Sequence, residues 1–125
     1  MIERHLERQD GIIFVRGKGD WSRGELDAHY DELRVLIAGI RAQGRPVRVL
    51  ADVTEAMPQS ASRERYIRTQ IERTYRPGDR VAIVVASAAV KQHVRDALTG
   101  TLVATFISRI AAEMWLMEAE LEPPR

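Results

Sequence analysis

The stretch that most constrains the fold is Arg45–Ser62, which reads RPVRVLADVTEAMPQSAS. The apolar run Val47–Leu50 predicts a strand whose apolar density suits a central place in a sheet, buried on both faces. It leads to Asp52, and an irregular loop over Glu55–Gln59 follows, because proline at position 58 disfavours regular structure. A buried strand followed by a loop and a new helix is typical of an α/β protein with parallel neighbouring strands.

A long first helix is predicted upstream of this strand. Ser22 and Glu25 have the S-x-x-E spacing of a capping box, in which each side chain bonds the other residue's backbone amide. Gly44 and Pro46 supply the stop signals. Apolar residues recur between these signals at helical spacing, as one stripe that should pack on a sheet: Leu26, Tyr30, Leu33, Ile37 and Ile40.

The other elements follow from β-branched runs and from serines that can cap helices. A turn at Asp10-Gly11 predicts an N-terminal hairpin of strands 3–8 and 12–15, the second bounded by glycines at 17 and 19. Further strands are expected over 81–85 and 102–107. Helices are expected from Ser60 or Ser62 to about Tyr75, after Ser87 and after Ser108. The helix at 62–75 has a thin apolar stripe and should be the most exposed. The helix after Ser87 should bury four apolar residues: Val90, Val94, Ala97 and Leu98. The helix after Ser108 should also bury four: Ala112, Trp115, Leu116 and Ala119.

The predicted fold is therefore α/β: a mixed sheet of about five strands, with an antiparallel hairpin and then βαβ units, and about four helices. The length of 125 residues fits a single domain, assigned here to residues 1–122, with a disordered tail at 123–125. The chain has no cysteine, no leader-like start and no apolar run long enough to span a bilayer, so a cytoplasmic location is expected. The net charge of +1 argues against a nucleic-acid-binding surface.

Candidate site residues gather at the carboxyl ends of the predicted strands, where ligands of open α/β sheets bind. Asp52 and Thr54 are either site residues or, as the preferred interpretation, an Asx-type turn. Ser60 and Ser62 are open to two interpretations. One of them caps the helix, which is preferred, or one accepts a phosphate that the helix N-terminus and nearby arginines would stabilise.

The segment after Ser62 is rich in arginine. These side chains suit an acidic partner, a phosphate group or contact with a membrane surface. The preferred interpretation is a solvated helix in which Glu64 and Glu72 are the ion-pair partners. The arginines are Arg63, Arg65, Arg68, Arg73, Arg76 and Arg80.

No pattern in the sequence indicates an enzyme. His5, His29 and His93 are far apart and stand in no metal-binding spacing, so neither a metal nor another cofactor is expected. Ser87 and Ser108 lack the G-x-S-x-G context of a hydrolase, and no nucleophile–base pair is visible.

Several short motifs carry a resemblance to a known family. They are Asp10-Gly11-Ile12-Ile13, Ala51-Asp52-Val53-Thr54, the strand Arg80–Val84, Thr105-Phe106 and the segment Ala111–Leu116. With the order of the predicted elements, they resemble the STAS-type fold, and more closely its SpoIIAA-like branch of small bacterial proteins, grouped with Sec14-like domains.

The resemblance implies a regulatory function. In anti-sigma-factor antagonists of this fold, a serine at the start of the helix after the central strand is phosphorylated. Ser60 or Ser62 stands at that place, but the aspartate before and the glycine after the family's serine are absent, so the phosphosite is degenerate. The first function hypothesis is thus a non-enzymatic protein-interaction module, with Asp52, Thr54, Arg63, Arg65 and Arg68 on its working surface.

The second function hypothesis is a carrier of a small molecule or lipid, implied by the Sec14-like kinship. If the helix that follows the central strand swings away from the sheet, Met57, Ile67 and Ile71 would line a groove beneath it. Self-association as a homodimer is a further expectation, because the acidic C-terminal stretch could meet the basic helix of a second copy.

Overall fold

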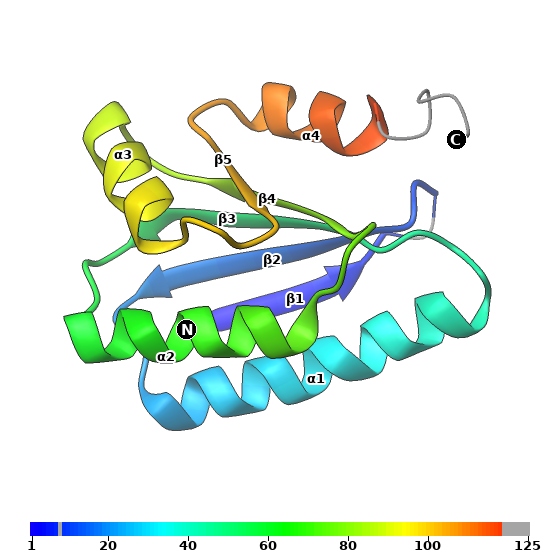
Figure 1. Ribbon diagram of the computed structural model, residues 1–125, viewed down its shortest axis with the longest axis horizontal. Coiled ribbons are helices and arrows are strands. Elements are labelled where there is room, and N and C mark those ends of the chain that lie inside the picture. The colour runs from blue at the N-terminus through cyan, green and yellow to red at the C-terminus, as the bar shows by residue number, and fades with distance from the viewer. Residues whose placement is uncertain (8, 119–125) are drawn as a thin grey trace.

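A computed structural model describes residues 1–7 and 9–118 as an α/β sheet with helices on both faces (Figure 1). The five strands lie in sequence order, β1-β2-β3-β4-β5. β1 and β2 form an antiparallel hairpin, and the other neighbours are parallel, as predicted. The predicted tail at 123–125 and the predicted core residue Ala119 lie outside the described residues. The elements are β1 (Ile2–Leu6), β2 (Ile12–Gly19), α1 (Arg23–Ala42), β3 (Arg48–Ala56), α2 (Ala61–Thr74), β4 (Arg80–Val84), α3 (Ala88–Ala97), β5 (Val103–Phe106) and α4 (Arg109–Glu118).

The two faces of the sheet belong to two separate apolar clusters, because successive side chains of a strand point to opposite faces. Ile13, Val49 and Val81 pack with α1 and α2, which lie together below the sheet in Figure 1. Ile12, Leu50 and Ala82 occupy the other face, which α4 covers. β3 is the middle strand, so the predicted central place of this strand is confirmed.

The capping box of α1 is present as predicted. Glu25 N donates to Ser22 Oγ at 3.1 Å, and Ser22 N donates to Glu25 Oε1 at 3.2 Å. All members of the predicted stripe, from Leu26 to Ile40, are buried against the sheet. Gly44 has φ +68° and provides the left-handed residue that follows the helix.

The predicted ends of two strands are wrong. β3 continues through Glu55 to Ala56, and β2 continues through Gly17 to Gly19. The two extensions pair with each other in the parallel ladder. The ladder shifts register at Gly17, which is where the Trp21 ring lies against the strand. A Cβ atom on Gly17 would be 2.5 Å from Trp21 Cζ2. The glycine therefore marks a close packing contact within the strand and not the strand's end.

The expected order of helix exposure is also wrong, because α3 and not α2 is the most exposed. α2 buries Gln70, Ile71 and Thr74, whereas no residue of α3 from Ala88 to Ala97 is buried. The reason is polar packing between α1 and α2. The guanidinium of Arg34 on α1 donates to Gln70 Oε1 at 3.1 Å and to Thr74 Oγ1 at 3.0 Å. The burial of polar residues by such hydrogen bonds cannot be predicted from the apolar stripe of a helix.

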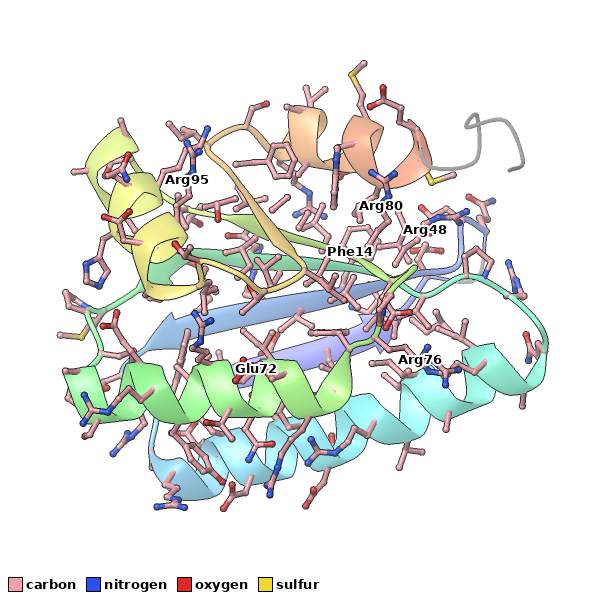
Figure 2. The ribbon with its side chains drawn as sticks, in the orientation of Figure 1. Phe14, Arg48, Glu72, Arg76, Arg80 and Arg95 are labelled. Carbon is pink, nitrogen blue, oxygen red and sulfur yellow. The ribbon has the colours of Figure 1, made fainter. Side chains whose placement is uncertain are left out.

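α4 covers the second face through Ala112 and Leu116, which are fully buried. Figure 2 shows Arg48 and Arg80 on the side of the sheet that α4 covers. The Arg80 guanidinium lies 4.8 Å from the centre of the Trp115 ring, so Trp115 is a half-buried stacking partner at the edge of this layer.

Candidate functional site

The N-terminal end of α2 follows the central strand after a short loop. Ser60 caps the helix, because its Oγ accepts a hydrogen bond from Arg63 N at 3.1 Å. Ser62 lies in the first turn, and its Oγ is 3.2 Å from Ser60 Oγ. Both serines are exposed to solvent.

Capping by Ser60 leads to a stability prediction. Replacing Ser60 by alanine should lower the free energy of unfolding by about 1 kcal/mol, because an amide of the first turn loses its partner. Ser62→Ala is the matched control and should change it by less than about 0.5 kcal/mol. Urea denaturation of the three proteins measures both values, and a larger loss for Ser62→Ala would mean that the cap is assigned to the wrong serine.

The loop before α2 is anchored to the end of β2. Met57 N donates to Gly19 O at 2.9 Å, and Gln59 Nε2 donates to Met57 O at 2.8 Å. Gln59 Oε1 accepts from Trp21 N at 3.4 Å. The guanidinium of Arg63 donates to the carbonyl oxygen of Trp21. These bonds fix the loop and the start of α2 to the segment that precedes α1.

A groove of about 470 Å³ lies beside this loop, between α2 and α3 and above the carboxyl ends of β3 and β4. Its volume is in the range of pockets that bind small molecules. Most of its wall is apolar. The lining residues are Trp21, Val53, Ala56, Met57, Pro58, Gln59, Glu64, Ile67, Ile83, Ala89, Val90, His93, Val94, Ala97 and Leu98.

Two contacts tie α2 to α3 along the groove. Glu64 Oε2 is 2.5 Å from His93 Nε2, and one helical turn further Arg68 Nη1 donates to the carbonyl oxygen of Ala97 at 3.0 Å. Arg68 also approaches Glu72 on its own helix, with Nε and Oε2 3.8 Å apart. The prediction that Glu72 pairs within α2 is therefore confirmed, whereas Glu64 pairs with α3.

Comparison with solved structures identifies the fold. An uncharacterised protein of the DUF3478 family from Shewanella loihica PV-4, described as having a SpoIIAA-like fold, superimposes with a TM-score of 0.64 at 18% sequence identity, covering 93% of this chain and 92% of that one. The chain has a SpoIIAA-like fold. An anti-sigma factor antagonist from Mycobacterium paratuberculosis superimposes with a TM-score of 0.60 at 14% identity, covering 94% of this chain and 95% of that one. The sequence matches no protein-family model and no curated protein.

Within the SpoIIAA-like fold, the predicted site residues divide between the two faces of the sheet. Met57 and Ile67 line the groove, whereas Ile71 is buried in the core beneath α2. Asp52 and Thr54 point to the opposite face, toward α4, because they alternate with the groove residue Val53 along β3. The residues that were predicted to form one surface therefore lie on two opposite faces of the sheet.

Asp52 and Thr54 form a local polar cluster on the α4 face. Asp52 Oδ1 accepts from Thr54 N at 3.0 Å and from Thr54 Oγ1 at 2.7 Å, the bonds of an Asx-type arrangement, although the strand continues past them. Partial burial acts to raise the pKa of Asp52. The bonds from Thr54 and the positive charges of Arg16 and Arg109 outweigh it, so that the pKa lies below its usual value.

The predicted arginines also have different surroundings. Arg63 bonds to the segment before α1, and Arg68 bonds to α3, as described above. Arg65 is exposed on α2. The structure therefore does not gather these three guanidinium groups around Ser60 and Ser62 as a ready phosphate site.

Sequence reasoning missed the α3 side of the groove. Val90, Val94 and Ala97 have helical spacing and were expected to pack in the core, and Val90 is exposed instead. His93 stood alone in the sequence, because its partner Glu64 is 29 residues away. The available signal for an incompletely packed helix was that α3 is short, with only ten residues after the Ser87 cap, and that its apolar side chains are small.

Two further features of the described residues concern membrane-spanning helices and groups of side chains that could hold a metal ion. No helix among them is long and apolar enough to cross a membrane. Within residues 1–7 and 9–118, no group of three or more histidine, aspartate or glutamate side chains is placed to hold a metal ion.

Proposed function

We propose that this chain is a non-enzymatic protein-interaction module of STAS type that uses the start of α2 and the preceding loop as its working surface. The observation that carries the proposal is the position of Ser60 and Ser62, exposed at the N-terminus of the helix that follows the central strand. The likeness to an anti-sigma factor antagonist adds support. Met57 adds an apolar contact residue, since 60% of its surface is exposed beside the serines.

In this proposal, phosphorylation of Ser60 or Ser62 controls binding of the partner. A phosphate at either position would lie at the positive end of the α2 dipole, where its oxygens can accept hydrogen bonds from backbone amides of the first turn. It would also add about two negative charges to a surface whose exposed side chains include Met57 and Arg65. A partner that binds the unmodified surface would therefore be released.

Site-specific cross-linking in the native host tests this function. A photo-reactive amino acid in place of Met57 should capture a defined protein, and the same group in place of the exposed Val35 on α1 should not. Ser62→Asp should reduce capture about tenfold, whereas Thr69→Asp, which adds the same charge further along α2, should leave it unchanged. Equal capture from positions 57 and 35, or none from either, would contradict the proposal. Intact-mass analysis of the native protein shows whether a phosphate is present.

A second candidate function is the binding of a small apolar molecule, and the groove between α2 and α3 favours it. The groove is present while α2 is packed on α1, so no movement of α2 is needed to create it. Native mass spectrometry of freshly purified protein should show a bound molecule of a few hundred daltons. A clean mass of the bare chain counts against this function.

A further inference from the structure

The apolar side of α3 lines the groove and contacts the core only at its edge, where Val94 packs. Val90 retains 41% of its exposed surface, and Val94 and Ala97 are only half-buried, although the three residues form one stripe. In each other helix of the described residues, at least two residues are fully packed. α3 therefore has an apolar surface that the rest of the described chain does not complete, and this surface is one wall of the groove.

The polar groups of the groove are already engaged. The Gln59 amide bonds to Met57 O and to Trp21 N, and Trp21 Nε1 donates to Lys18 O at 3.0 Å. Of the described residues that line the groove, only Glu64 and His93 have titratable side chains, and they bond to each other. A charged group placed inside would lose its hydration, and the two ionisable side chains of the lining, Glu64 and His93, are already paired with each other.

The two ties between α2 and α3 limit the size of an occupant. The Glu64–His93 and Arg68–Ala97 contacts link α2 and α3 at two points that are one helical turn apart. A partner helix, which is about 10 Å wide, could not enter the groove without breaking both contacts. Its volume of about 470 Å³ suits a small molecule instead. The exposed side chains of Met57 and Val90 mark the end at which it opens to solvent.

From these observations, we infer that the groove binds a compact, uncharged, largely apolar small molecule, with α3 packing against it. The inference rests on the second candidate function and adds the class of ligand. A ligand of this kind would bury the stripe of Val90, Val94 and Ala97 and would stabilise α3 on the sheet.

A matched pair of fluorescent probes tests the class of ligand. N-phenyl-1-naphthylamine is uncharged, and 8-anilino-1-naphthalenesulfonate has the same rings with a sulfonate added. The uncharged probe should bind one to one, and the sulfonate should bind at least about tenfold more weakly because its charge must enter an apolar site. Equal or tighter binding of the sulfonate would overturn the inference but leave the second candidate function standing. Binding of neither probe would overturn the inference, and with a clean native mass that function would fail too.

Variants that fill the groove test whether the uncharged probe binds there. Ala97→Phe and Ala89→Phe add a ring to the groove wall, and each should weaken binding of the uncharged probe at least about tenfold. Ala38→Phe adds the same ring to the exposed side of α1 and should leave binding unchanged. Thermal melting checks that each variant folds. Should Ala97→Phe unfold, Ala89→Phe in the exposed first turn of α3 still decides the test. Unchanged binding in the folded variants would overturn the inference.

Discussion

Replacing Leu116 by alanine is expected to lower the free energy of unfolding by about 3 kcal/mol. Leu116 has no exposed surface, and with Ala112 it holds α4 on Leu50 and Ala82 of the sheet. The loss has two parts, the transfer of the removed methyl and methylene groups and the cavity left in a layer that a single helix covers. Urea denaturation followed by far-UV circular dichroism measures it, provided that unfolding is two-state.

Met114→Ala is the control for this prediction. Met114 belongs to the same helix, and 68% of its surface is exposed, so its truncation should change the free energy of unfolding by less than about 0.5 kcal/mol. The pair tests the orientation of α4 about its axis. Similar losses for the two variants would show that α4 does not lie on the sheet as described.

The parts of the fold that were predicted correctly depend on short-range signals. The capping box at Ser22 and Glu25 and the stripe from Leu26 to Ile40 lie within one helix, and each signal needs only its own neighbours. The order of strands and helices follows for the same reason. The alternation along β3 also contains enough information to separate Asp52 and Thr54 from Val53, although the predicted surface did not use it.

The errors arise from contacts between different structural elements, which the pattern within one element does not show. Gly17 resembled a strand end because the Trp21 ring that fills its place belongs to the next segment. Gln70 and Thr74 resembled solvated residues because Arg34, which buries them, lies on another helix.

The groove has the same origin. A stripe such as Val90 and Val94 has the same spacing whether it faces a packed core or an open cavity. Only the distance between α2 and α3 separates the two cases, and the contacts that link these helices, Glu64–His93 and Arg68–Ala97, join residues 29 positions apart in the chain. Periodicity therefore identified the helix correctly but not what its apolar side meets.

A loss of stability is expected in mild acid, and it should depend on His29. This side chain is only 6% exposed on α1, and its Nδ1 accepts a hydrogen bond from Arg4 Nε at 3.2 Å. Arg4 also pairs with Glu32, and the Tyr30 ring lies 4.8 Å from the His29 ring. Burial and then the positive charge of Arg4 lower the pKa of His29 to about 4.

The direction of the pH effect follows from this lowered pKa. In the unfolded chain, His29 takes up a proton near its ordinary value of about 6.5, so the unfolded state binds more protons between about pH 6.5 and about pH 4. Stability should therefore fall as the pH drops through that range. The loss attributable to His29 is about 2 kcal/mol between about pH 7 and about pH 5. The lowered pKa of Asp52 has its effect below this range, because its ordinary value is 3.8.

His29→Gln separates this effect from other titrations. Glutamine cannot be protonated in this range, yet its side-chain oxygen can still accept the bond from Arg4. The variant should be less stable than the natural chain near neutral pH, because a flexible amide replaces a packed ring. Its unfolding free energy, measured in urea, should change little between about pH 7 and about pH 5. The same fall in both proteins would show that His29 is not the group responsible. A fall in the natural chain alone would identify it, since His5 and His93 are unchanged in the variant and exposed in both proteins.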